Sequence, residues 1–156
     1  MQREAGASGR NVPLIAIVDD DESVRDSLRS LIRSVGFRAE VFASAEEFLE
    51  SRPPNQLSCL ILDARMPQSS GLDLQRLLAK EERSVPIIFI TAHVDDVARE
   101  AALQAGAVAF LYKPFTADAL LHAVRSAVNQ STKDHAFSAD LRVDDASTDK
   151  LNRKWI

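Results

Sequence analysis

Four short runs of apolar residues are spaced along the chain, and each of them predicts a buried strand. They span residues 14–18, 57–62, 87–90 and 108–112. Apolar residues are continuous in these runs, which is typical of parallel strands that are covered on both faces. A fifth run, 38–42, carries charged residues at alternate positions. It therefore predicts a strand at the edge of the sheet.

Between these runs, apolar residues recur every three or four positions, which predicts amphipathic helices. The clearest stripe ends before Gly36, a residue type that commonly follows a helix, and comprises Val24, Leu28, Leu31, Ile32 and Val35. Another helix is expected to begin at Ser44, because Ser44 and Glu47 have the spacing of a capping box. Three more helices are expected over residues 72–79, 94–105 and 116–128.

Strands and helices therefore alternate along the chain, with five of each. This alternation predicts an α/β fold in which helices cover both faces of one parallel sheet. Because crossovers between parallel strands are right-handed, we expect a doubly wound five-stranded parallel sheet with five helices. A ligand site would then lie at the carboxyl ends of the strands.

Composition and charge narrow the function further. The 156 residues carry a formal net charge of −4, so no basic excess indicates direct binding of nucleic acid. The single cysteine, Cys59, cannot form an internal disulfide and is expected in the core. No apolar run approaches the roughly 18 residues of a membrane span. We therefore expect a cytoplasmic protein that does not insert into membranes.

The two ends of the chain differ from its middle. Residues 1–11 are small and polar, and residues 130–156 are rich in Ser, Thr, Asp and Lys. We expect a flexible N-terminal tail over 1–11, a folded domain over 12–129, and a C-terminal tail over 130–156 that is disordered or contains a short docking helix. The last segment has balanced charge and is too short for a DNA-binding domain.

Chemically reactive residues stand where the expected strands end. Asp19 and Asp20 follow the first strand, Asp63 the third, Thr91 the fourth and Lys113 the fifth. Three carboxylates at one edge would repel one another unless a cation lay between them, and Mg²⁺ prefers such hard oxygen ligands. Lys113 and Thr91 could hold the oxygens of a transferring phosphoryl group, with Asp63 as the nucleophile. The pattern predicts a phosphoryl-transfer site.

These residues and their spacing resemble the receiver domain of bacterial two-component response regulators, in particular the nitrogen-fixation-regulator-like subfamily. The resemblance covers about residues 12–129 and implies a flavodoxin-like fold. The residues that carry it are Asp19-Asp20, Leu62-Asp63-Ala64-Arg65-Met66-Pro67, Gly71, Thr91-Ala92 and Lys113-Pro114-Phe115.

The resemblance implies how the site is built. Asp63 would be the phosphoacceptor, assisted by Lys113 and Thr91. Mg²⁺ or Mn²⁺ would be bound directly by the carboxylates of Asp20 and Asp63 and by the backbone carbonyl of Arg65. The carboxylate of Asp19 would bind the metal ion through water. The Lys113–Pro114 peptide bond would be cis, an isomer that proline makes accessible.

The resemblance also implies a switch and its partners. Thr91 would move toward the phosphoryl group and Phe110 would change rotamer, although simple core packing explains Phe110 equally well. A sensor histidine kinase or phosphotransfer protein would donate the phosphoryl group. A downstream protein, or a second copy of the chain, would bind the face formed by residues 94–128.

His93 and Arg65 would border the path of the water that hydrolyses the phosphoryl group. Such a domain is a phosphoacceptor switch that catalyses its own phosphorylation and dephosphorylation, and it is not a conventional enzyme.

Other interpretations stay open. The chain is either a single-domain regulator or a receiver fragment of a larger transcriptional regulator. A Mg²⁺-dependent aspartyl-phosphate phosphatase would also use a strand-end aspartate, but it needs a second aspartate two residues later, where Arg65 stands. A flavin or nucleotide binder would need a Gly- or Ser/Thr-rich loop where residues 19–22 are acidic. A receiver that is never phosphorylated is disfavoured, because all five expected positions carry competent residues.

Overall fold

One five-stranded parallel sheet runs through the computed structural model, which describes residues 12–51, 57–67, 70–81 and 83–136. The strand order is β2-β1-β3-β4-β5. The strands are β1 (Leu14–Val18), β2 (Arg38–Phe42), β3 (Leu57–Asp63), β4 (Ile87–Thr91) and β5 (Ala109–Tyr112). They alternate with α2 (Glu22–Ser34), α3 (Ala45–Ser51), α4 (Gly71–Lys80), α5 (Asp96–Gln104) and α6 (Ala117–Ala136). The predicted doubly wound fold is confirmed.

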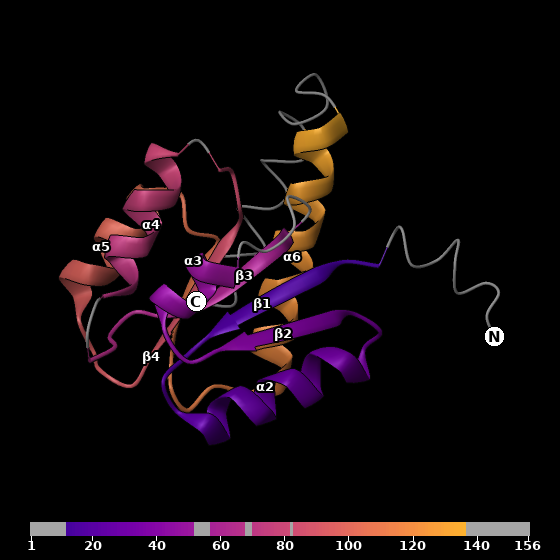
Figure 1. Ribbon diagram of the computed structural model, residues 1–156, viewed down its shortest axis with the longest axis horizontal. Helices are drawn as coiled ribbons and strands as arrows, with labels where there is room; N and C mark the ends of the chain where they lie inside the picture. The colour runs from indigo at the N-terminus through magenta and orange to yellow at the C-terminus, as the bar shows by residue number, and fades with distance from the viewer. Residues whose placement is uncertain (1–11, 52–56, 68–69, 82, 137–156) are drawn as a thin grey trace, which may run out of the picture.

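Two layers of helices cover the sheet (Figure 1). Ile17, Ile61 and Ile88 pack on the face covered by α2 and α6, whereas Leu60 and Phe89 pack on the face covered by α3, α4 and α5. Every residue of β1 and β4 is buried. Burial from both sides explains why these strands read as continuous apolar runs.

The two edge strands differ in how well the sequence identifies them. β2 lies at one edge, as predicted, and its exposed residues Arg38 and Glu40 alternate with buried ones. β5 lies at the other edge, although its apolar run suggested a central strand. Its residues are buried because Ala109 and Leu111 pack against α6 while Phe110 packs on the α5 side. Two helix layers can therefore give an edge strand the pattern of a central one.

Two helix boundaries were predicted wrongly. α5 begins at Asp96, not at residue 94, because the side chain of Asp95 caps the helix by accepting a hydrogen bond from the Ala98 backbone N–H at 3.0 Å. α6 continues to Ala136 and so passes residue 128, its expected end. Residues 130–136, expected in the tail, are helical, and none of them is a Gly or Pro that would break a helix. The division of the chain at 129 stays a prediction, and residues 1–11 and 137–156 lie outside the described residues.

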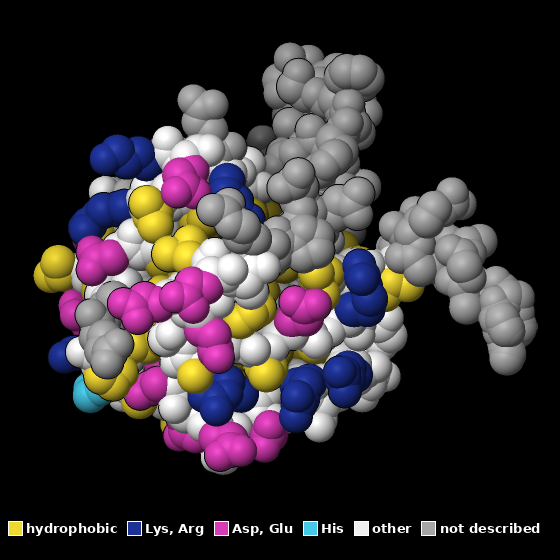
Figure 2. Space-filling view, in the orientation of Figure 1, with side chains coloured by type: hydrophobic (Ala, Val, Ile, Leu, Met, Phe, Trp, Pro, Cys, Tyr) yellow, Lys and Arg dark blue, Asp and Glu magenta, His cyan; other side chains and the backbone are white. Residues whose placement is uncertain are grey.

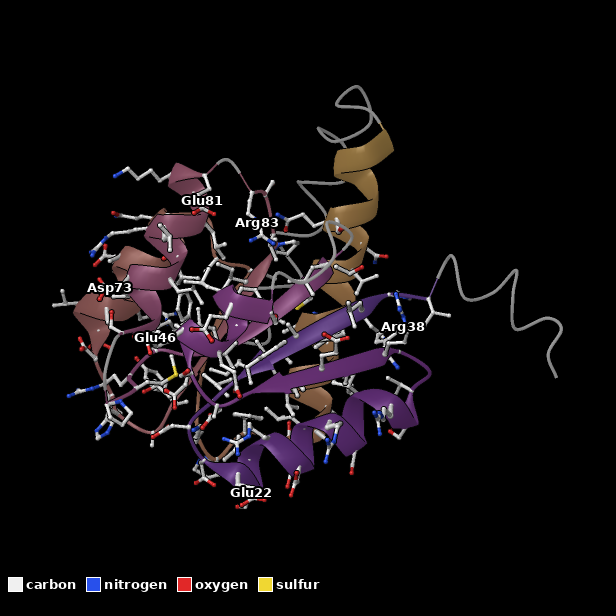
Figure 3. The ribbon with its side chains drawn as sticks, in the orientation of Figure 1. Glu22, Arg38, Glu46, Asp73, Glu81 and Arg83 are labelled. Atoms are coloured by element: carbon white, nitrogen blue, oxygen red, sulfur yellow. The ribbon has the colours of Figure 1, made fainter. Side chains whose placement is uncertain are left out.

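The helices begin at the edge where the strands end. Figure 3 labels Glu22, Glu46 and Asp73, which lie in the first turns of α2, α3 and α4 around this edge. Arg38, the first residue of β2, lies at the opposite end of the sheet. Side chains of both charges share the face shown in Figure 2. Within the described part of the chain, no helix is both long and apolar enough to cross a bilayer.

Candidate functional site

Three aspartates lie together at the carboxyl edge of the sheet. Asp19 and Asp20 directly follow β1, and Asp63 is the last residue of β3. Because β1 and β3 are neighbours, one carboxylate oxygen from each aspartate lies within 4.8 Å of the other two. Asp19 and Asp63 are buried, whereas Asp20 is exposed. The aspartate cluster that the sequence predicted is therefore present, and Asp20 is its solvent-exposed member.

Asp19 is held in place by groups from several elements. Its backbone N–H donates to the Phe42 carbonyl at the end of β2, at 3.1 Å. Its Oδ1 accepts the Asp21 backbone N–H at 2.8 Å, and its Oδ2 accepts the Lys113 ammonium at 3.0 Å. Its backbone carbonyl accepts Nη1 of Arg25 at 2.8 Å. Since its side chain is fully buried, these bonds fix both the carboxylate and the turn that carries it.

Lys113 brings a positive charge to the cluster from the end of β5. Its Nζ lies 3.0 Å from Oδ2 of Asp19 and 3.5 Å from Oδ2 of Asp63. Burial alone would lower the pKa of Lys113, but the hydrogen bond that its ammonium donates to Asp19 and the charges of Asp63 and Asp19 outweigh this effect, and the pKa is raised. Lys113 is therefore a firmly charged group. Its peptide bond to Pro114 is cis, as the family resemblance implied.

Asp63 has an unusually high pKa for an aspartate. Burial and the nearby carboxylates of Asp19 and Asp20 raise the pKa of Asp63 from 3.8 to about 6. The Arg65 backbone N–H, which donates to its Oδ1 at 2.9 Å, and the charge of Lys113 oppose this shift without cancelling it. The hydrogen bond and the positive charge that the protein supplies therefore do not fully offset the negative charge of the Asp63 carboxylate.

Thr91 and Phe110 occupy buried positions on the neighbouring strands. Thr91 is the last residue of β4 and follows Ile90, which pairs with Asp63; its Oγ accepts the His93 backbone N–H at 3.2 Å. Phe110 is 2% exposed, and its ring centroid lies 5.7 Å from that of Phe89 and 5.6 Å from that of Tyr112. Core packing of Phe110 is therefore observed. A switching role for Thr91 and Phe110 stays a prediction.

Two contacts with the site were missed by sequence reasoning. Gly71 lies so close to the end of β3 that a Cβ there would come 2.5 Å from the Asp63 carbonyl oxygen. The sequence identified Gly71 only through the family motif. Arg25 reaches the Asp19 carbonyl from α2. The available signal was a basic residue near the start of a helix, where acidic residues are favoured.

The donor set fits a hard divalent cation. Three carboxylates around one small space offer the oxygen ligands that Mg²⁺ and Mn²⁺ prefer, and one of them is accessible to solvent. The ammonium group of Lys113 faces two of these carboxylates. A divalent cation would offset the remaining negative charge. What this arrangement offers is a carboxylate nucleophile, Asp63, between a cation site and a fixed ammonium group.

A comparison with known protein families shows the family to which this chain belongs. Residues 15–125 match the family described as the response regulator receiver domain. The chain belongs to this family. Its receiver fold places Asp63 at the end of the third strand, with the acidic pair and Lys113 beside it.

Relatives of the receiver domain are two-component regulators. The chain is 41% identical over 141 residues to response regulator protein TmoT of Ectopseudomonas mendocina, covering 90% of this chain and 64% of TmoT. It is 34% identical over 143 residues to transcriptional regulatory protein FixJ of Bradyrhizobium diazoefficiens, covering 90% of this chain and 70% of FixJ. The solved structure of response regulator StyR has a TM-score of 0.73 at 43% identity, covering 91% of this chain and 68% of StyR. The chain therefore spans less than two thirds of TmoT.

Proposed function

We propose that this receiver domain accepts a phosphoryl group on Asp63 from a phosphohistidine of a sensor kinase or phosphotransfer protein. The observation that carries the proposal is the position of Asp63, whose carboxylate meets both the Asp19–Asp20 pair and Lys113 at the carboxyl edge of the sheet. Arg65 occupies the position where an aspartyl-phosphate phosphatase would need its second aspartate. This supports a switch over a phosphatase that turns over external substrates.

In the proposed transfer, an oxygen of the Asp63 carboxylate attacks phosphorus. A P–O bond forms while the P–N bond to the donor imidazole breaks, and the imidazole leaves with the electron pair of that bond. Lys113 holds one phosphoryl oxygen by its charge, and Thr91 donates a hydrogen bond from its hydroxyl to another. The product is an acyl phosphate on Asp63.

The proposed metal ligands are Asp20, Asp63 and the backbone carbonyl of Arg65, with Asp19 acting through water. Mg²⁺ or Mn²⁺, when bound, supplies the positive charge that offsets the carboxylates and the incoming phosphoryl group. Asp19 already accepts hydrogen bonds on both carboxylate oxygens, from Asp21 and Lys113. This favours an indirect role for Asp19 and a direct one for Asp20, which is exposed.

We also propose that phosphorylation changes partner binding on the face formed by residues 94–128, through movement of Thr91 and Phe110. Val94 and Val97 on this face are 79% and 80% exposed, so apolar side chains are available to a partner or a second copy. A single-domain regulator and a receiver within a larger transcriptional regulator could both use such a switch, and the chain spans 64% of TmoT. A cytoplasmic location stays a prediction.

Binding of Mn²⁺ should weaken as the pH falls below about 6. The pKa of Asp63 is raised to about 6, so a proton competes with the metal for this ligand below that pH. With one proton displaced per metal ion, we expect affinity to fall by about fivefold between pH 6 and pH 5. Isothermal titration calorimetry at a series of pH values measures this.

Asp21→Asn is the matched control for the pH series. Hydrogen bonds from the Val24 and Ser23 backbone N–H groups lower the pKa of Asp21, whose exposed side chain caps α2. The variant should therefore show the same pH profile as the wild type. An affinity that is equal at pH 7 and pH 5 in the wild type would mean that Asp63 is not a ligand.

His93 and Arg65 should set the lifetime of the acyl phosphate. Both side chains are exposed, two residues after Thr91 and Asp63 respectively, where they can orient the attacking water. We expect His93→Ala and Arg65→Ala each to slow hydrolysis several-fold, as followed by intact-mass spectrometry after removal of the phosphodonor. Arg76→Ala, which removes an exposed arginine paired with Asp73, is the control. Decay at the wild-type rate in both variants would remove these two residues from the proposal.

A further inference from the structure

Arg25 makes a hydrogen bond beside the site that has no role in the proposed reaction as described above. From α2, its guanidinium donates from Nη1 to the backbone carbonyl of Asp19 at 2.8 Å. Asp19 is fully buried, whereas Arg25 is half-buried, so the contact closes one side of the turn between β1 and α2. In Figure 1 this turn lies where β1 ends and α2 begins, at the edge that carries the site.

The contact bears on Asp20 through the geometry of the peptide bond. The carbonyl of Asp19 and the N–H of Asp20 belong to one planar peptide group. Holding the carbonyl in one direction therefore holds the plane from which Asp20 projects. Asp20 depends on this, because it is exposed and no group of the described residues donates a hydrogen bond to its carboxylate. Asp19, in contrast, is fixed by its own side-chain bonds to Asp21 and Lys113.

The position of Arg25 is not explained by helix stability. It lies four residues after Asp21, the N-cap of α2, near the positive end of the helix dipole. Cations are disfavoured there and acidic residues favoured, as Asp21 and Glu22 illustrate. What distinguishes Arg25 is the contact of its guanidinium with the Asp19 carbonyl.

We infer that Arg25 is a positioning residue of the metal site, which aims the Asp20 carboxylate by holding the Asp19–Asp20 peptide group. The inference rests on the proposed function, because it concerns the cation that the phosphorylation site would bind. Groups that orient a metal ligand without touching the metal affect affinity by about 10- to 100-fold. Arg25 acts in this way on the backbone that carries a ligand.

The charge of Arg25 and its positioning role have opposite effects, which makes the inference testable. Arg25 is a cation near a cation site, so removing its charge alone would strengthen the binding of a divalent metal. Removing the hydrogen bond to the Asp19 carbonyl would weaken binding, because the Asp20 carboxylate would lose its fixed direction. The sign of the change in affinity therefore separates the two effects.

The experiment measures Mn²⁺ affinity by electron paramagnetic resonance of the free ion, for the full chain at pH 7.5. Arg25→Met keeps the apolar part of the side chain and removes the donor, and we expect its Kd to rise by about tenfold. Arg25→Lys keeps the charge and one possible donor, and it should recover part of the loss. Arg29→Met is the matched control, because Arg29 lies one turn further along α2 and pairs with Asp26 at 3.1 Å. Its Kd should equal that of the wild type.

The outcomes distinguish this inference from the proposed function. A Kd for Arg25→Met that equals or falls below the wild-type value overturns the inference, even if the variant melts at a lower temperature in EDTA. If Arg25→Met does not fold by circular dichroism, Arg25→Leu, which also lacks a donor, takes its place with the same expected weakening. A wild-type protein that binds no Mn²⁺, or binds it unchanged after Asp63→Asn, overturns the proposed metal site itself and the inference with it.

Discussion

Asp63→Asn should make the fold more stable in the absence of divalent metal. The pKa of Asp63 is raised to about 6 by burial and by the neighbouring carboxylates, so its charged form is disfavoured in the folded protein at pH 7. Asparagine has nearly the same shape and can still accept the Arg65 N–H, which Asp63 binds at 2.9 Å. Removing the charge should raise the free energy of unfolding by about 1–3 kcal/mol at pH 7.

The stabilisation should depend on pH in a defined direction. The folded-state pKa of Asp63, about 6, lies above the ordinary value of 3.8. The contribution of the protonated group to stability is therefore fully present below pH 3.8 and is lost as the pH rises through 6. Asparagine does not titrate, so the advantage of Asp63→Asn should grow between pH 4 and pH 7.

Urea unfolding in EDTA at several pH values measures this advantage. Asp73→Asn is the control, because Asp73 is an exposed aspartate in the first turn of α4. Its effect on the free energy of unfolding should stay nearly constant from pH 5 to pH 7. A variant Asp63→Asn that is less stable than the wild type at pH 7 would show that Lys113 compensates the buried charge fully.

Gly71→Ala should destabilise the fold and disturb the site together. An added Cβ would lie 2.5 Å from the Asp63 carbonyl oxygen and 3.1 Å from the Ala64 Cα. Both neighbours are backbone atoms, and the Gly71 N–H is itself bonded to the Ala64 carbonyl at 2.9 Å. The clash can be relieved only by moving α4 away from the end of β3. We expect a loss of about 1–3 kcal/mol in the free energy of unfolding and several-fold weaker Mn²⁺ binding.

Gly106→Ala is the control for Gly71→Ala. Gly106 precedes β5 at the amino ends of the strands, away from the site. Its φ of +106° would strain any residue with a Cβ, although the space around it is open. The variant should lose about 1–2 kcal/mol and keep the wild-type Mn²⁺ affinity. Unfolding by urea and calorimetric titration of Mn²⁺ give both quantities for each variant. Wild-type Mn²⁺ affinity in Gly71→Ala would contradict a tight coupling between α4 and Asp63.

The fold could be predicted because burial on both faces leaves a simple trace in the sequence. β1, β3 and β4 are continuous apolar runs, and each is followed by a helical stripe. The aspartate cluster was predictable for a related reason. Parallel strands end at one edge, so a polar residue at the end of an apolar run lies near the polar ends of its neighbours.

Features set by tertiary distances could not be predicted in the same way. The raised pKa of Asp63 depends on its burial beside Asp19 and Asp20, and the clash at Gly71 depends on how closely α4 approaches β3. Neither distance is encoded in a local pattern. β5 was misplaced because a run of apolar residues reports burial, and both helix layers bury this edge strand. The contact of Arg25 joins residues six positions apart across a turn whose shape the sequence does not specify.

Intact-mass spectrometry after incubation with acetyl phosphate shows whether Asp63 accepts a phosphoryl group. The wild type and Asp63→Asn would be compared with Mg²⁺ and with EDTA. We expect one phosphoryl group on the wild type and none on Asp63→Asn. The group should form only with Mg²⁺ and should be lost on standing, as acyl phosphates are. Absence of any adduct on the wild type, or an equal adduct on Asp63→Asn, would contradict the assignment of Asp63 as the phosphoacceptor.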